Sequence, residues 1–354
     1  MDTPSDPLAL LRSRNYLALL VLAAVIGVPV SAAAWGFLAL VSEAQGWIFS
    51  DLPKALGLGA EPLWWPVPWL ALAGLLVALV IRYLPGTGGH SPASGFHAGG
   101  APSPIELPGV LAAALATLCL GVVLGPEAPL IALGGGLALL AVTLSRRSVP
   151  PRTAAVVASA GSFAAISTLL GSPILGAFLL MEASGLGGAT MELVLVPGLL
   201  AAGIGSLVFI GLGTWSGLGT YSLAIPGLPH VAQPDAPEFG YAVGIGLAAV
   251  VVGLGVRRLA LLLRPHVERR ILLLSPVAGL AVAGLAIAYA SGTGRSSSEV
   301  LFSGQSALAP LLQQGAGYPI AALLLLLTCK ALAYGVSLSN FRGGPIFPSL
   351  FLGA

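Results

Sequence analysis

Long apolar runs dominate the chain, and short polar segments separate them. The runs cover about residues 16–42, 66–81, 107–145, 153–181, 193–229, 239–256, 271–294 and 300–329, and together they contain a single charged residue, Glu127. A helix needs about 20 apolar residues to cross a bilayer, and several of these runs are long enough for two helices. The pattern therefore predicts an all-α, polytopic integral membrane protein with roughly ten to twelve helical segments.

The composition agrees with this prediction and excludes other classes. Apolar residues make up 56% of the 354 positions, charged residues make up 8%, and the mean hydropathy is +0.97, which is typical of membrane proteins. The apolar runs are continuous, whereas the strands of a membrane barrel alternate apolar and polar residues. Basic residues cluster in short loops, which is the distribution that orients helices in a bilayer. We therefore expect the lipid bilayer as a partner, and no nucleic acid.

The ends of the chain suggest how it is organised. Residues 1–15 are polar and include Arg12 and Arg14, so we predict a cytoplasmic N-terminal segment followed by a retained first helix. Residues 16–354 are predicted to form one transmembrane domain, with Pro226 to Glu238 as a loop between two halves. Because the last residues are still apolar, we expect that further helices follow in the full protein.

Glu127 is the residue that points most directly to a function. It is the only charged residue between Glu106 and Arg146, and a charge inside a membrane span marks a functional site by default. Its setting is Gly125-Pro126-Glu127-Ala128-Pro129, in which a glycine and two prolines favour the end of one helix and the start of another. The sequence thus predicts a carboxylate at the junction of two broken helices.

Two further glycine and proline motifs occur at the edges of apolar runs, at Gly86-Thr87-Gly88-Gly89-His90-Ser91-Pro92 and at Gly343-Gly344-Pro345-Ile346-Phe347-Pro348. Each is predicted to begin a helix, so that backbone N–H groups and the positive end of the helix dipole face outward. Three such ends meeting at the membrane midplane would bind a small anion. Glu127 would then compete with that anion, and its protonation would open the site.

These motifs resemble those of a known family. Gly125-Pro126-Glu127-Ala128-Pro129 is similar to the Gly-Arg-Glu-Gly-Pro motif of the CLC chloride channels and transporters, and Gly344-Pro345-Ile346-Phe347-Pro348 is similar to their Gly-x-Phe-x-Pro motif. Gly88-Gly89-His90-Ser91-Pro92 falls where that family has Gly-Ser-Gly-Ile-Pro. The resemblance extends from about Arg12 to Ala354.

The resemblance implies a CLC-like fold, with interrupted and tilted helices in inverted repeats, and a homodimer with one anion pathway per subunit in a bacterial-type cytoplasmic membrane. It implies that Glu127 is the external gate and that the backbone N–H groups of Ile346 and Phe347 bind chloride. The other residues that it assigns to the anion site are Gly89, Ser91, Gly125, Pro126 and Gly344.

Three departures from the family pattern affect the expected mechanism. Gly89 replaces the serine that helps select chloride, and Pro126 replaces the arginine before the gate. Glu182 matches the first acid of the helix that ends in two acids in proton-coupled exchangers, but Ala183 replaces the second, the internal proton-transfer glutamate. Alanine cannot relay a proton, so we predict a passive channel or uncoupled pathway first. Proton/chloride antiport through Glu127 and Glu182 is the alternative.

Several polar residues allow two interpretations. Glu182 is either a proton-pathway residue or an interfacial one, and Lys330 either snorkels or adds positive potential to the internal vestibule. A remote alternative is a membrane-embedded hydrolase that uses Ser91 and His90, with His97 and Glu106 nearby. Because the chain has no His-Glu-x-x-His and no Gly-x-Ser-x-Gly motif, we expect it not to be an enzyme.

Metal and cofactor sites are not expected either. The two cysteines, Cys119 and Cys329, lie inside apolar runs without metal-ligand spacing, and they are predicted to pack as small hydrophobic side chains.

Overall fold

A computed structural model describes residues 14–59, 61–95, 100–145, 150–184, 189–222, 235–314 and 317–354. The chain divides into two compact units. Unit 1 comprises residues 1–40, 96–111 and 127–224, and unit 2 comprises residues 41–95, 112–126 and 225–354. In the described ranges, twelve α-helices have eight residues or more, as the apolar runs predicted. The predicted N-terminal segment and most of the predicted loop before Glu238 lie outside these ranges.

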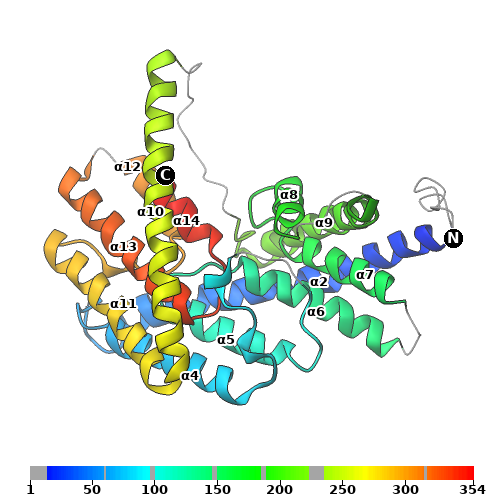
Figure 1. Cartoon of the computed structure of the whole chain (residues 1–354), viewed down its shortest axis with the longest axis horizontal. Coiled ribbons are helices and arrows are strands. Elements are labelled where there is room, and N and C mark those ends of the chain that lie inside the picture. Colours follow the sequence, from blue (N-terminus) through cyan, green and yellow to red (C-terminus); the bar gives the residue numbers. More distant parts are fainter. Residues whose placement is uncertain are drawn as a thin grey trace. The chain divides into compact units, whose positions relative to one another are not determined.

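Unit 1 is built from helices that approach one another closely. It contains the first part of α2 (Arg14–Gly46), together with α6 (Glu127–Leu144), α7 (Pro151–Ala165), α8 (Pro173–Ser184) and α9 (Ala189–Ser216). Helices α6 and α7 lie side by side, and they cross at Gly134 and Gly161, where a Cβ on either residue would overlap the other's backbone (Figure 1). Small residues at such crossings let helix backbones pack together in a membrane.

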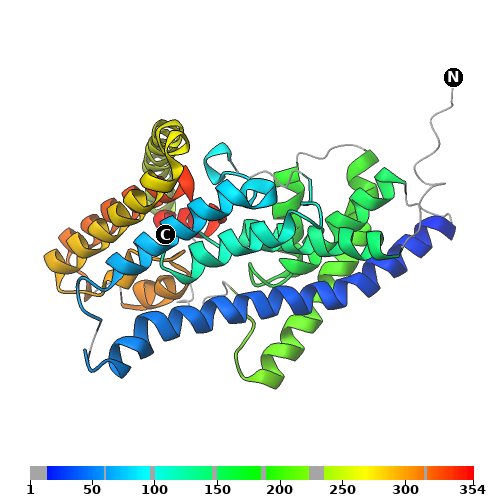
Figure 2. The same ribbon diagram turned by 90° about the horizontal axis from the view of Figure 1, so that it is seen from below.

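Unit 2 contains the rest of α2, which continues through the π-turn Trp47–Asp51 into α3 (Leu52–Ala55). Its other helices are α4 (Pro66–Tyr83), the end of α5 (Leu107–Cys119), α10 (Ala236–Arg269), α11 (Ile271–Thr293), α12 (Gln305–Gln314), α13 (Ile320–Asn340) and α14 (Ile346–Gly353). Helix α11 packs against α4 on one side and against α13 on another, and Figure 2 shows the orange α11 and the orange-red α13 side by side.

Seven helices in the described ranges are long and apolar enough to cross a membrane. The chain is accordingly a multi-pass membrane protein, as predicted. Two helices differ from the predicted runs, because α10 continues through its basic residues to Arg269 and α13 continues past Lys330 to Asn340. A helix can include such charges when their side chains find polar partners, and Lys330 does so, as shown below. The first half of α10 is exposed and extends past the other helices of its unit (Figure 1).

Candidate anion site

The predicted break before Glu127 is present. Helix α5 ends at Cys119 and α6 begins at Glu127, and the linker between them is buried, with Val122, Val123 and Leu124 each 0% exposed. This linker belongs to unit 2, which holds it at three points. Phe302 N donates to Gly121 O at 3.2 Å, Val123 N donates to Ser337 Oγ at 3.3 Å, and Gly125 forms two backbone bonds with Gly344.

The Gly125–Gly344 pair joins the second and third motifs. Gly125 N donates to Gly344 O at 2.8 Å, and Gly344 N donates to Gly125 O at 2.6 Å. The neighbouring Gly343 has no room for a side chain, because a Cβ there would lie 2.7 Å from the Cβ of Leu124. Two segments that are far apart in the sequence therefore run together, each just before it enters a helix.

The third motif begins α14 as predicted. Ile346 and Phe347 are the first two residues of this helix, and the N–H groups of a first turn have no acceptor within the helix itself. Pro345 precedes them, and its carbonyl oxygen accepts hydrogen bonds from Tyr334 Oη at 2.7 Å and from Ser349 Oγ at 2.6 Å. The Tyr334 bond ties the start of α14 to α13, and the Ser349 bond lies within the first turn of α14.

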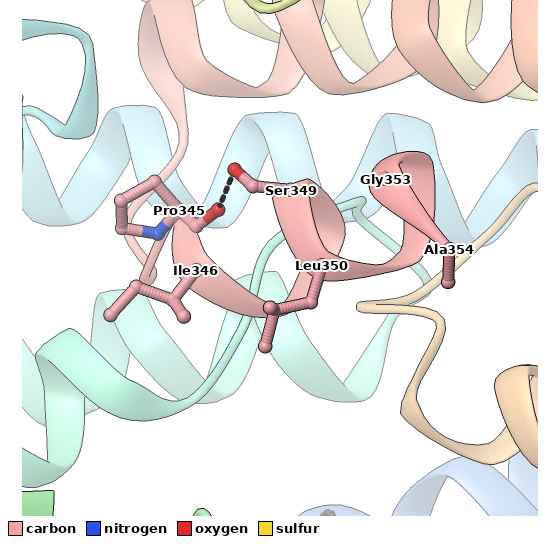
Figure 3. Close-up of a pocket in the computed structure, with 6 residues that line it drawn as sticks. All are labelled: Pro345, Ile346, Ser349, Leu350, Gly353 and Ala354. Carbon is pink, nitrogen blue, oxygen red and sulfur yellow. Dashed lines mark hydrogen bonds between the residues drawn. The ribbon is translucent and has the colours of Figure 1, made fainter. Parts of the chain in front are cut away.

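An open, mainly apolar groove follows the outer side of α14. Figure 3 shows its lining, which consists of Pro345, Ile346, Ser349, Leu350, Gly353 and Ala354. The hydroxyl of Ser349 is turned back onto the Pro345 carbonyl, so it does not offer its proton to the groove. The side chains that line this groove therefore carry no charge.

The first motif does not form the predicted α-helix N-terminus. Residues 86–89 all have positive φ angles, and in the described stretch up to Gly95 a short 3₁₀ turn, Pro92–Ser94, follows Ser91. Gly95, with φ of 98°, ends that turn. A three-residue turn has almost no macrodipole, so Gly89 and Ser91 lie in a loop and not at the positive end of a helix. That part of the prediction is wrong.

Arg342, which is not among the predicted site residues, connects this loop to α5 and to the third motif. Its Nε donates to Thr87 O at 3.3 Å, and its backbone N donates to Thr117 Oγ1, near the end of α5, at 3.2 Å. Arg342 comes directly before Gly343 in the third motif. The signal for it was available, because it is the only Asp, Glu, Lys or Arg between Lys330 and Ala354.

Glu127 itself belongs to unit 1 and is the first residue of α6. Its side chain is 0% exposed, and it lies two residues after Gly125 along the chain. Glu182 is different, since it lies near the end of α8 with an exposed side chain. The side chain of Ala183 lies outside the described part of the structure.

Lys330 does not snorkel, so that prediction is wrong, whereas its contribution to the potential of the internal vestibule stays a prediction. The side chain is 0% exposed, and Nζ donates to the carbonyl oxygens of Glu299 at 2.9 Å, Val300 at 3.0 Å and Leu301 at 3.1 Å. The ring centroid of Phe351 lies 4.4 Å from Nζ. Lys330 therefore stabilises a buried segment of backbone.

The geometry gives no support to the hydrolase alternative. Ser91 Oγ is buried without a hydrogen-bond partner in the described ranges, and the side chain of His90 is exposed. The carboxylate of Glu106 accepts hydrogen bonds from the backbone N and the hydroxyl of Ser103, and His97 lies outside the described residues. In the part of the chain that the structure describes, no three His, Cys, Asp or Glu residues are placed to bind a metal ion.

Comparison with known proteins identifies a family and several relatives of this chain. The profile of a family described as voltage gated chloride channel matches residues 71–354. The chain is 32% identical to proteins of Salmonella schwarzengrund and Salmonella typhimurium that carry the name of an ion-transport protein, YfeO, and the match covers 97% of this chain and 80% of theirs.

Two solved structures are similar in fold. One is a CLC-type fluoride/proton antiporter, with a TM-score of 0.62 and 21% identity, matched over 95% of this chain and 79% of that one. The other is a slow cyanobacterial Cl⁻/H⁺ antiporter, with a TM-score of 0.68 and 19% identity, matched over 94% of this chain and 76% of that one.

Proposed function

Because the chain belongs to the voltage gated chloride channel family, the CLC family, we propose that it conducts a small inorganic anion, chloride first, through a passive pathway that Glu127 gates. The proposed anion-binding elements are the loop at Gly89 and Ser91, the linker at Gly125 and Pro126, and the start of α14 at Gly344, Ile346 and Phe347. A homodimer with one pathway in each subunit is part of the same proposal.

The observation that carries the proposal is the position of Glu127. A carboxylate with 0% exposure stands at the first position of α6, and the linker that precedes it is bonded to the segment that precedes α14. First-turn N–H groups and helix dipoles attract anions and carboxylates alike. Ionised Glu127 would compete with a permeating anion for the same donors, whereas protonated Glu127 would neither compete for them nor repel the anion.

A passive pathway is preferred because alanine follows Glu182, where the family resemblance predicts the internal proton-transfer glutamate. Glu182 has an exposed side chain, and the position after it is alanine, which carries no proton. The two solved relatives in fold are both named as antiporters, so proton exchange through Glu127 and Glu182 is the alternative that an experiment must exclude.

The gate is tested with Glu127→Gln in liposomes. Chloride efflux, balanced by a potassium ionophore, should rise in the wild type as the pH falls and Glu127 becomes protonated. In Glu127→Gln the efflux should stay high, varying less than about twofold between pH 4 and pH 7.5, since the amide cannot ionise. Glu43→Gln, which changes an exposed acid on α2, should keep the wild-type pH profile. An unchanged profile in Glu127→Gln would remove Glu127 as the gate.

Coupling is tested separately in the wild type. A chloride gradient is imposed across the liposome, and the internal pH is recorded with a trapped dye. A passive pathway moves no protons uphill, whereas an antiporter does. If the wild type pumps protons and Glu182→Gln abolishes this pumping, the protein is a proton/chloride antiporter and not a passive pathway.

A further inference from the structure

Arg342 is held beside the first motif by backbone oxygens. Its Nε donates to Thr87 O at 3.3 Å, and its Nη1 donates to Asn340 O at 3.0 Å. Its side chain also covers Gly88, because a Cβ built there would lie 3.5 Å from the Cγ of Arg342. The guanidinium is thus fixed between the end of α13 and the glycine-rich loop.

Within the described residues, the charge of this guanidinium has no direct counter-charge. The salt bridges found in the described ranges do not include Arg342. The charged residues that face it are Arg264 and Glu268, and these two already pair with each other at 2.7 Å. Arginine remains protonated in proteins, so a permanent positive charge is left next to the loop. Unpaired charges inside a membrane protein are costly and mark ion pathways.

Two buried polar groups on the same segments also lack partners in the described part of the chain. They are Nδ2 of Asn340, whose residue is 3% exposed, and Oγ of Ser91. The carbonyl of Asn340 is the one that binds Arg342, and α13, which ends at Asn340, packs against the 3₁₀ turn that follows Ser91. A buried donor without an acceptor destabilises the fold unless a ligand, an ion or an ordered water molecule satisfies it.

We propose that Arg342 is a cationic anion-binding residue of the permeation pathway, where it holds the anion beside the Gly88 to Ser91 loop together with the Asn340 amide and the Ser91 hydroxyl. The inference rests on the proposed anion transport. It adds that a full positive charge, and not helix ends alone, sets the affinity on this side of the site.

The residues around Arg342 indicate on which side of the membrane it lies. Arg82 lies in the last turn of α4, just before the loop, and Arg264 Nη1 donates to Ser94 Oγ at 2.7 Å, at the loop's other end. Arg269 and Arg270 stand at the junction of α10 and α11. Basic residues concentrate on the cytoplasmic side of a membrane protein. Arg342 therefore acts on the anion near the cytoplasmic entrance.

The test compares chloride binding and transport in Arg342→Gln, Arg342→Lys and the wild type. Glutamine keeps hydrogen-bond donors but loses the charge, so the apparent chloride dissociation constant, measured by calorimetry in detergent, and the half-saturating chloride concentration for flux should both rise about tenfold. Arg342→Lys should stay within about threefold of the wild type. The matched control is Arg82→Gln, an exposed arginine on the same side, and it should change either value less than about twofold.

The possible outcomes separate the two proposals. A wild type that neither binds nor conducts chloride contradicts the proposed function. A wild type that does both, with Arg342→Gln behaving like Arg82→Gln, contradicts only the role of Arg342. If Arg342→Gln does not fold, Arg342→Lys decides, because burial lowers the pKa of a lysine and the side chain loses its charge in alkali. Chloride affinity at pH 10.5 should then fall at least about threefold more in Arg342→Lys than in the wild type, and equal behaviour would overturn the proposal.

Discussion

Lys330 and Arg342 are both cations in the α13 region, one within the helix and one just beyond its end, but their surroundings differ. Lys330 is 0% exposed, and its ammonium has three carbonyl acceptors and the face of Phe351. Arg342 binds carbonyl oxygens through Nε and Nη1, and no salt bridge in the described ranges includes it. A cation whose donors are all satisfied holds backbone in place, whereas one with donors in reserve can bind a ligand.

The largest expected effect is a loss of stability when Lys330 is replaced. Lys330→Met removes three charge-assisted hydrogen bonds and leaves buried carbonyl oxygens without a donor, so we expect the free energy of unfolding to fall by about 3–5 kcal/mol. Arg342→Gln should lower it by about 1 kcal/mol or less, since glutamine can still donate to the same oxygens. Unfolding followed by near-UV circular dichroism in a denaturing detergent series measures both values. If Arg342→Gln were the more destabilised variant, the assignment of roles would be reversed.

A smaller, functional effect should follow a change at the other end of the loop. Arg264 Nη1 donates to Ser94 Oγ, but Arg264 is also paired with Glu268, so part of its charge is already balanced. Arg264→Gln should therefore weaken chloride binding only about twofold to threefold, well below the effect of Arg342→Gln. Titration of the two variants side by side tests this order. An equal loss of chloride affinity in both variants would mean that the summed basic charge around the loop, and not Arg342 in particular, sets the affinity.

The smallest expected effect is a change in stability near the backbone segment, Glu299 to Leu301, that Lys330 binds. Glu61 holds this segment from another side, because it accepts hydrogen bonds from Ser297 Oγ at 2.8 Å and Ser298 Oγ at 3.1 Å. Burial raises the pKa of the Glu61 carboxyl, and the two serine bonds oppose that rise. The folded state therefore binds this proton more tightly than the unfolded state does, so Glu61 lowers stability above its folded pKa. This cost disappears as the pH falls to the ordinary range of a glutamate.

Glu61→Gln should consequently stabilise the protein at neutral pH by less than about 1 kcal/mol, because partial exposure screens the charge. The gain should vanish near pH 4, which unfolding curves recorded from pH 4 to pH 8 would show. Glu43→Gln, at an exposed position, serves as the control and should show no such trend. A gain for Glu61→Gln that grows as the pH falls would contradict the assigned direction.

Predictions from the sequence are confirmed where local chemistry decides the backbone. The break before Glu127 and the start of α14 at Ile346 follow from glycines and prolines in apolar runs, and both are present. The loop after Gly86 does not begin an α-helix, although its motif also contains glycines before a proline. Glycine allows positive φ angles as readily as it allows the end of a helix, and neighbouring structure selects between them.

By itself, the sequence determined the class of protein, the helical spans and the three motifs, because hydrophobic length and glycine and proline positions act within a few residues of the chain. Only the tertiary structure decided how the polar groups are used. Whether Lys330 faces water or three carbonyls, and whether Arg342 meets a carboxylate or the Thr87 carbonyl, depends on segments far away in sequence. Hydrogen bonds are satisfied by the groups that packing brings within about 3 Å, and no local pattern specifies those groups.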